Sequence, residues 1–220
     1  MTPIVSIVGL SNVGKTTYLE KLVRELKARN YRVATVKHDV HGFELDRPGK
    51  DSWRHAQAGA DAVVISSPEK LALIRRTDHD STIEEIARHL GGGFDLIITE
   101  GFKRGKAPKI EVHRREVGSD LLCTEEELLA LATDERLEMS VPQFPLDDAS
   151  PMADFLEDWL RTRHGTEEAT LYLDGEPVRI VPFVQEILSR TVFAIVSTLK
   201  GVGTPKRIEL TVHRDGPAKQ

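Results

Sequence analysis

The feature that most constrains this chain is a glycine-rich segment that directly follows an apolar run near the N-terminus. The apolar run covers residues 4–8, and the segment after it reads Gly9-Leu10-Ser11-Asn12-Val13-Gly14-Lys15-Thr16. This is the phosphate-loop pattern, in which Gly and four free positions precede Gly-Lys-Ser/Thr. The two glycines let the backbone turn tightly, so that successive amides can point at a phosphate. The segment therefore predicts a phosphate site between a strand and a helix.

Side chains in and after this loop have the chemistry that a nucleoside triphosphate requires. Lys15 can place a cation against the β- and γ-phosphates, and the Thr16 hydroxyl can bind Mg²⁺. The helix expected over 15–29 presents its positive end to the phosphates. The predicted nucleotide-binding set is Gly9, Leu10, Ser11, Asn12, Val13, Gly14, Lys15, Thr16 and Thr17.

Strand-like and helical segments alternate over residues 1–165, which predicts an α/β fold of the phosphate-loop NTPase class. Its sheet should be mostly parallel, twisted and flanked by helices. Strands are expected at 4–8, 31–36, 61–66, 71–74, 94–99 and 109–113. Helices are expected at 15–29, 81–90, 121–131 and 152–163. Ser81 with Glu84 predicts a capping box for the second of these helices.

The C-terminal residues 166–220 have a different pattern and are predicted to form a small ββαβ module. Residues 170–180 indicate a hairpin that turns at Asp174-Gly175, and Pro182 opens a helix with an apolar face. Residues 207–212 then indicate a closing strand. A module of this size has little core of its own, so we expect it to act as a binding or dimerising module.

Composition excludes several classes of partner. The 220 residues carry a formal net charge of −5, which does not indicate nucleic-acid binding. No apolar stretch is long enough to span a bilayer, so no membrane association is expected. The lone Cys123 excludes an internal disulfide and fits a reducing, cytoplasmic setting.

Acidic residues at two strand ends extend the predicted site. Glu100 follows a strongly apolar strand, and ligands gather at the carboxyl ends of parallel strands. Glu100 is therefore a candidate to support Mg²⁺ or to orient an attacking water, which makes it, with Lys15, a candidate catalytic residue. Thr133-Asp134 follows another apolar stretch, where an acid could accept two hydrogen bonds from a guanine base.

Two polar segments allow more than one interpretation. The long connection from His38 to His55 can be a mobile element over the phosphates, an ordinary polar loop, or a metal site built on His38, His41 and Asp46. A basic cluster after Glu100 can attract phosphate-rich ligands or be a solvated surface. Its members are Lys103, Arg104, Lys106 and Lys109.

Several of these motifs occur together in one known family. They are the phosphate loop, Val36-Lys37-His38, Gly49-Lys50-Asp51-Ser52, Ala58-Gly59-Ala60, Thr99-Glu100-Gly101-Phe102-Lys103 and Pro108-Lys109-Ile110-Glu111-Val112. Over roughly the first 155 residues the chain resembles the molybdopterin-guanine dinucleotide biosynthesis adaptor (MobB) family. The resemblance adds Asp51 to the nucleotide-binding set.

The resemblance implies GTP binding with Mg²⁺, weak GTPase activity and a homodimer. It also implies work beside the molybdenum cofactor guanylyltransferase, which joins GMP to Mo-molybdopterin. Turnover should be slow, because no arginine is evidently placed to contact the transferred phosphate.

Two other functions remain open from the sequence. A metal-delivery GTPase would carry nickel or a similar ion on His38 and His41. A small-molecule kinase would use the basic cluster to hold an acceptor other than water.

Overall fold

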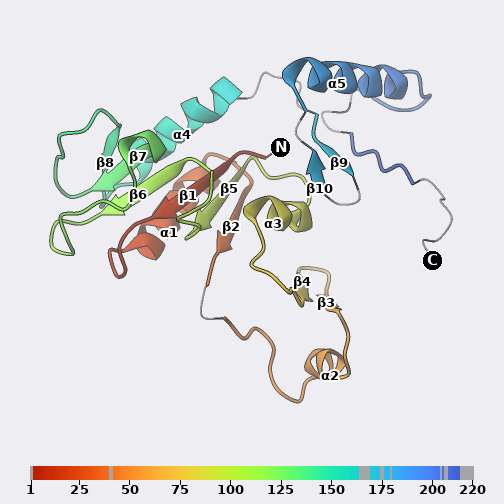
Figure 1. Ribbon diagram of the computed structural model, residues 1–220, viewed down its shortest axis with the longest axis horizontal. Helices are drawn as coiled ribbons and strands as arrows, with labels where there is room; N and C mark the ends of the chain where they lie inside the picture. The colour runs from red at the N-terminus through yellow and green to blue at the C-terminus, as the bar shows by residue number, and fades with distance from the viewer. Residues whose placement is uncertain are drawn as a thin grey trace. The chain divides into compact units, whose positions relative to one another are not determined.

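A six-stranded parallel sheet forms the centre of the first compact part of the chain, Thr2–Asp158 (Figure 1). The computed structural model describes residues 2–39, 42–163, 169–173, 176–178, 180–203, 205 and 208–213. The strand order is β2-β5-β1-β6-β7-β8, and every neighbouring pair runs parallel. This confirms the predicted α/β fold, with the strand that enters the phosphate loop in the middle of the sheet.

The elements of this part follow the predicted alternation. Its sheet strands are β1 (Ile4–Val8), β2 (Val33–Lys37), β5 (Leu96–Glu100), β6 (Lys109–His113), β7 (Leu128–Thr133) and β8 (Gln143–Pro145). Its helices are α1 (Lys15–Ala28), α2 (Asp51–Gln57), α3 (Ile83–Leu90) and α4 (Ser150–Arg163), with a 3-10 turn at Glu125–Glu127. A separate pair of strands is β3 (Ala62–Ser66) and β4 (Leu71–Arg75).

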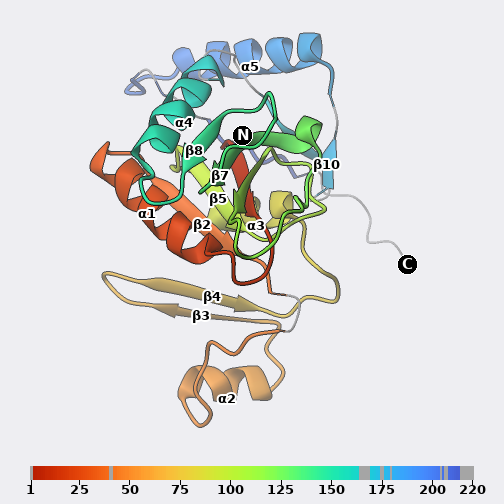
Figure 2. The same cartoon turned by 90° about the vertical axis from the view of Figure 1, so that its left-hand side faces the viewer.

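Helices cover both faces of the main sheet, as a parallel sheet requires. Figure 2 shows α1 and α3 on opposite sides of the strands. Ile83 of α3 packs against Ala34 of β2 and Ile97 of β5. The side chains that α1 buries are Tyr18, Leu19, Leu22 and Leu26. These leucines have the spacing of one helix face, which is why the sequence pattern predicted this helix correctly.

The helix predicted over 121–131 is wrong. This segment instead forms the 3-10 turn and then β7, which pairs with β6. The carboxylate of Glu111, buried on β6, accepts the backbone N–H groups of Leu122 at 2.7 Å and Cys123 at 3.0 Å. These bonds hold the segment across the sheet face, where Cys123 packs with Val8 and Leu128. Burial there raises the pKa of the Cys123 thiol to about 12, as expected for an inert packing residue.

The strands predicted at 61–66 and 71–74 exist but do not join the main sheet. As β3 and β4 they pair antiparallel with each other, for example Val63 opposite Ile74. Together with α2 they lie in an excursion, residues 39–79, between the end of β2 and the start of α3. The alternation of strands and helices alone could not distinguish this hairpin from two further parallel strands.

The capping box of α3 lies one residue later than predicted. The Thr82 hydroxyl accepts the Glu85 N–H, and the Glu85 carboxylate accepts the Thr82 N–H. The sequence offers Ser81 with Glu84 and Thr82 with Glu85 equally, and only the second pair leaves Ile83 buried against the sheet.

Residues from Trp159 onward form a second compact unit. It contains the antiparallel pair β9 (Leu171–Leu173) and β10 (Glu176–Val178), and the helix α5 (Pro182–Ser197) with proline in its first turn. Asp174 and Gly175, the predicted turn, and Arg207 lie outside the described residues.

The closing strand predicted at 207–212 is wrong over the part that is described. Residues 208–213 are not a strand, and Leu210 and Val212 are exposed. An apolar alternation makes a strand only where a neighbouring strand pairs with it. The assignment of 1–165 and 166–220 as separate domains stays a prediction. No helix within the described ranges is long and apolar enough to cross a membrane.

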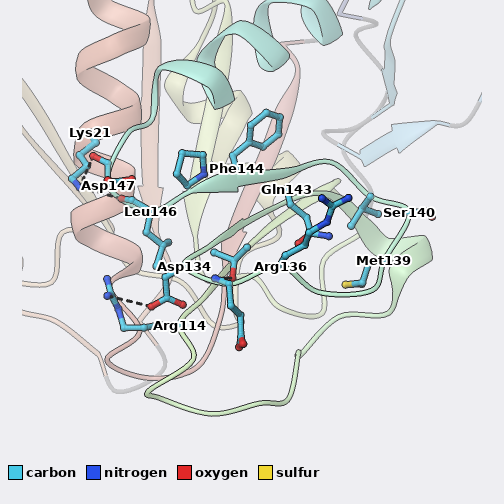
Figure 3. A pocket seen from close by; sticks show the side chains of 14 residues that line it. Lys21, Arg114, Asp134, Arg136, Met139, Ser140, Gln143, Phe144, Leu146 and Asp147 are labelled. Atoms are coloured by element: carbon cyan, nitrogen blue, oxygen red, sulfur yellow. Dashed lines mark hydrogen bonds and ion pairs between the residues drawn. The ribbon is translucent and has the colours of Figure 1, made fainter.

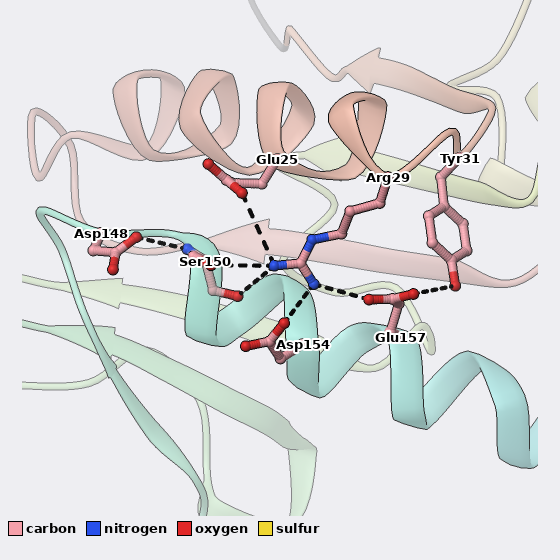
Figure 4. Close-up of polar contacts among 7 residues, drawn as sticks. All are labelled: Glu25, Arg29, Tyr31, Asp148, Ser150, Asp154 and Glu157. Atoms are coloured by element: carbon pink, nitrogen blue, oxygen red, sulfur yellow. Dashed lines mark hydrogen bonds and ion pairs between the residues drawn. The ribbon is translucent and has the colours of Figure 1, made fainter.

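Arg29 fastens the end of α1 to α4 (Figure 4). Its guanidinium contacts the carboxylates of Asp154 at 2.6 Å and Glu157 at 2.9 Å, and donates to the Ser150 carbonyl at 3.2 Å. The Arg29 side chain is only 19% exposed. Charge-assisted bonds in a partly buried place are stronger than those at the surface, so this cluster should contribute measurably to stability.

We expect Arg29→Ala to lower the free energy of unfolding by about 1.5–3 kcal/mol, because it removes charge-assisted bonds from the partly buried cluster around Asp154 and Glu157. Urea denaturation followed by circular dichroism measures this free energy. Arg24→Ala is the matched control, since Arg24 is 75% exposed and pairs with Glu20 on the same helix; its cost should be below about 0.5 kcal/mol. Equal costs for the two variants would contradict this account.

Candidate functional site

The phosphate loop has the backbone conformation that a cradle of amides requires. Gly9, Asn12 and Gly14 have φ values of 146°, 62° and 96°. A methyl group at Gly9 would overlap the carbonyl oxygen of Val112, so the close approach of the loop to β6 requires glycine. α1 begins at Lys15, and no side chain within the described ranges caps its first N–H groups. These amides and the positive helix end therefore face the loop interior.

Lys15 folds back over the loop. Its ammonium donates to the carbonyl oxygens of Gly9 at 3.2 Å and Leu10 at 2.7 Å. Burial and the positive charge of Lys103 lower the pKa of Lys15, while Glu100 acts in the opposite direction and Lys37 adds a smaller lowering. A cation in this setting is stabilised by an incoming anion, which is what a phosphate provides.

Thr16 and Glu100, the two residues predicted to support Mg²⁺, contact each other. The Thr16 hydroxyl lies 2.8 Å and 3.0 Å from the two carboxylate oxygens of Glu100. Glu100 ends β5, which pairs on one side with β1 and on the other with β2, so that Ile7 and Lys37 are its register neighbours. A hydroxyl and a carboxylate beside a phosphate cradle are the oxygen ligands that Mg²⁺ prefers.

The loop after β5 lies at the same edge. Gly101 has φ 105° and donates its N–H to Ile7 O, and Phe102 has φ 52°, which is rare for an aromatic residue. Lys103 follows and is exposed, as are Arg104 and Lys106 of the predicted basic cluster. Lys109 does not belong to that cluster: it is buried, and its ammonium contacts Glu127 at 2.9 Å.

The candidate metal residues do not come together. His38 contacts Asp80, while Asp46 accepts the Ser52 hydroxyl at 3.1 Å. His41 lies outside the described residues. Within the described ranges no group of three or more His, Cys, Asp or Glu side chains could hold a metal ion. The hypothesis of a site on His38, His41 and Asp46 therefore gains no support.

Asp51 is found away from the predicted set. It begins α2, its side chain is 90% exposed, and it lies 3.8 Å from Arg54. It lines a second hollow of about 550 Å³ within the excursion, between residues 45–55 and 63–66. Its proposed contact with a nucleotide stays a prediction.

A larger cavity of about 970 Å³ opens beside the phosphate loop, at the carboxyl ends of β7 and β8 (Figure 3). Arg114 lies between the phosphate loop and the cavity. A methyl group at Gly14 of the loop would lie 3.9 Å from the Arg114 guanidinium, and the guanidinium is 3.7 Å from Asp134 of the cavity. Asp134 accepts the Arg115 N–H at 2.9 Å. Lys21 of α1 also lines the cavity and donates to the carbonyls of Leu146 and Asp147, each at 3.1 Å.

Sequence reasoning identified Asp134 in this cavity but missed Lys21 and Arg114. Arg114 directly follows a buried strand, as Glu100 does, and this shared position was a usable signal. Lys21 lies in the polar part of an amphipathic helix, and no pattern in the sequence marks it as a site residue. Its place in the cavity depends on where β8 ends.

Comparison with known proteins decides the family. Residues 4–134 match the family model described as MobB, molybdopterin guanine dinucleotide synthesis protein B. The chain belongs to the MobB family. It is 38% identical over 164 residues to the molybdopterin-guanine dinucleotide biosynthesis adapter protein of Haemophilus influenzae, covering 74% of this chain and 92% of the relative. For the Escherichia coli adapter protein the identity is 32% over 170 residues, covering 75% and 97%.

A relative from Methanocaldococcus jannaschii extends the match toward the C-terminus. This putative adapter protein is 26% identical over 232 aligned positions, covering 95% of this chain and 97% of its own length. A crystal structure of molybdopterin-guanine biosynthesis protein B superposes with a TM-score of 0.57 at 34% identity, covering 72% of this chain and 99% of that one. A Bacillus subtilis MobB structure gives 0.54 at 29% identity, covering 72% and 97%.

We expect Gly9→Ala to lower the free energy of unfolding by at least about 2 kcal/mol more than Gly49→Ala. Both glycines have positive φ, so both substitutions strain the backbone, but only Gly9 is pressed against another backbone segment while Gly49 has open space around it. Thermal or urea unfolding of the two variants measures the difference. Similar losses would show that the loop does not need its close approach to Val112.

Proposed function

We propose that this MobB family member is an adaptor in molybdopterin guanine dinucleotide biosynthesis that works by binding GTP with Mg²⁺. The observation that carries the nucleotide part is the contact of Thr16 with Glu100 beside an open phosphate cradle. A hydroxyl, a carboxylate, the loop amides and a lysine are then grouped at one edge of the sheet. This is the set of groups that a magnesium-bound triphosphate needs.

The loop would hold the phosphates through its backbone. The N–H groups of residues 9–17 surround the β-phosphate, and the Lys15 ammonium exchanges its present carbonyl partners for phosphate oxygens. Negative phosphate oxygens then raise the lowered pKa of Lys15. Phosphate binding therefore favours the protonated, positively charged form of Lys15.

Mg²⁺ would lie between the Thr16 hydroxyl and the phosphates. Glu100 then holds the ion directly or through a bound water, and it can also orient a water for attack. Lys37 and Lys103 bring further positive charge to this edge. Within the described residues no arginine contacts the cradle except Arg114, which already faces Asp134. Hydrolysis should therefore be slow, with Lys15 and Glu100 as its catalytic residues.

The cavity beside the loop supports guanine as the base. It opens past Arg114, whose guanidinium lies near Gly14 of the loop, so that a nucleotide with its phosphates in the cradle would extend its base into this cavity. There Asp134 presents a carboxylate that is 35% exposed. One carboxylate can accept the ring N–H and the amino group of guanine, whereas adenine offers no such pair of neighbouring donors.

The partners of this function are proposed from the family. The chain would assist the molybdenum cofactor guanylyltransferase that joins GMP to molybdopterin, and it would do so in the cytoplasm. The lone, buried Cys123 is consistent with that reducing compartment.

We also propose a homodimer, formed through the β3–β4 hairpin. An isolated two-stranded hairpin is marginally stable in water, yet this one exposes an apolar surface. Its exposed side chains are Val64, Ile65, Leu71 and Leu73. A second copy of the same hairpin supplies matching apolar strands and unpaired strand edges, so the two copies can complete one sheet.

We expect titration calorimetry with Mg²⁺ to show clear preference for GTP over ATP in the full chain. Lys15→Ala should weaken GTP binding at least about 100-fold, since a charged contact of this kind is worth about 3 kcal/mol. Lys27→Ala is the control, because Lys27 lies at the other end of α1, where it donates to Tyr31 O. Binding that survives Lys15→Ala would contradict the phosphate-loop assignment, and equal affinity for ATP would contradict the guanine assignment.

We expect light scattering to give a mass of twice the 24.6 kDa of one chain. Leu71→Glu combined with Leu73→Glu should convert the protein to a monomer, because like charges then meet across the apolar surface. Leu173→Glu, a substitution of an exposed leucine in the β9–β10 hairpin, should leave the mass unchanged. A monomeric wild type, or a dimer lost only with the Leu173 variant, would contradict the assignment.

A further inference from the structure

The two ends of the excursion meet at a single side-chain contact. The chain leaves the main sheet at His38 and returns at Asp80, just before α3. The His38 Nε2 atom lies 3.0 Å and 3.1 Å from the two carboxylate oxygens of Asp80. We call this pair the neck. The returning segment also contacts α3, since Arg75 lies 3.3 Å from His89 and His79 lies 3.2 Å from Glu85. The neck is therefore one of several contacts that attach the excursion, with α2 and the β3–β4 hairpin, to the rest of the first unit.

Phe102 packs directly on the neck. Its ring centroid lies 4.6 Å from that of His38, at an interplanar angle of 34°. Phe102 has φ 52°, which is a strained backbone conformation for such a residue. Gly101 before it has φ 105°, and a methyl group there would lie 3.1 Å from the His38 Cβ atom. The loop is thus held against His38 in a strained conformation.

The same short loop borders the proposed triphosphate site. Glu100, the residue before it, contacts the Thr16 hydroxyl, and the Gly101 N–H donates to Ile7 O at the entrance of the phosphate loop. Lys103, next after Phe102, lies close enough to Lys15 for its charge to act on that ammonium. Three consecutive residues therefore connect the edge of the phosphate site with the neck.

We propose that Gly101-Phe102-Lys103 is a coupling loop through which bound triphosphate loosens the neck. This rests on the proposed function, since it requires GTP to bind. The γ-phosphate attracts the Lys103 ammonium, and Phe102 moves with it because the two residues are adjacent. Release of the strain at Phe102 offsets part of the cost of moving its ring away from the cluster of Ala34, Ile83 and Ile97, against which it packs.

When the Phe102 ring moves away, the His38 side chain keeps its contact with Asp80, whose carboxylate is 77% exposed. An exposed pair of this kind contributes little to stability. The neck therefore opens more often when triphosphate is bound. The exposed apolar β3–β4 hairpin lies in the excursion. We therefore expect binding of a partner to this hairpin to depend on the bound nucleotide.

Hydrogen–deuterium exchange of the full chain, with and without Mg²⁺ and a non-hydrolysable GTP analogue at saturation, tests the coupling. We expect exchange in peptides covering residues 71–82 to quicken by about fivefold on nucleotide binding. Phe102→Ala should remove this difference while calorimetry shows GTP still bound. Phe183→Ala, at an exposed aromatic of α5, is the control and should respond as the wild type does.

A second variant changes the neck itself and leaves the coupling loop intact. Asp80→Asn should make the same peptides exchange rapidly with and without nucleotide, since the neck is then already loose. Unchanged exchange in a wild type that binds the analogue, or a wild-type response in Phe102→Ala, would overturn the coupling and leave the proposed function intact. A wild type that does not bind the analogue in calorimetry would instead reject the proposed function.

Discussion

The parallel pairing of β1 with both β5 and β6 is the constraint on which the functional edge depends. Because all three strands run the same way, the phosphate loop, Glu100 and Arg114 emerge at one edge of the sheet. The close approach of Gly9 to Val112 fixes the loop on one side, and the bond from the Gly101 N–H to Ile7 O fixes the other. The site is therefore a consequence of strand order, with side chains from distant segments brought together by backbone pairing.

Strand order also explains which parts of the site could be predicted from the sequence. The phosphate loop is local: its glycines, its lysine and its helix are adjacent in the chain, so the pattern alone located them. Glu100 could be selected as a candidate because it ends a strongly apolar strand, and the structure places it in contact with Thr16. Its role at the site stays a prediction. Lys21 could not be selected, because its place in the cavity depends on where α1 and β8 meet. Arg114 was missed although it directly follows a buried strand.

The errors have a common physical cause. The 121–131 segment is apolar enough for a helix or a strand. The observed structure is favoured by Glu111 of β6, whose carboxylate accepts the backbone N–H groups of Leu122 and Cys123. The strands of the excursion were placed in the main sheet because local sequence does not show which neighbour a strand will have. The strand expected at 207–212 fails for the same reason, since residues 208–213 show no pairing strand. The local hydrophobic pattern indicates that a helix or strand forms, and pairing with distant segments determines where in the fold a strand lies.

The most direct measurement of the central claim is reconstituted formation of the guanine dinucleotide. It would use Mo-molybdopterin, GTP and the guanylyltransferase, with the wild-type chain, the Lys15→Ala variant or no added chain. The account predicts faster product formation with the wild type, and a rate with the variant that matches the reaction without the chain. Equal assistance from wild type and variant would show that the chain acts on this reaction without its phosphate loop, and would contradict the account.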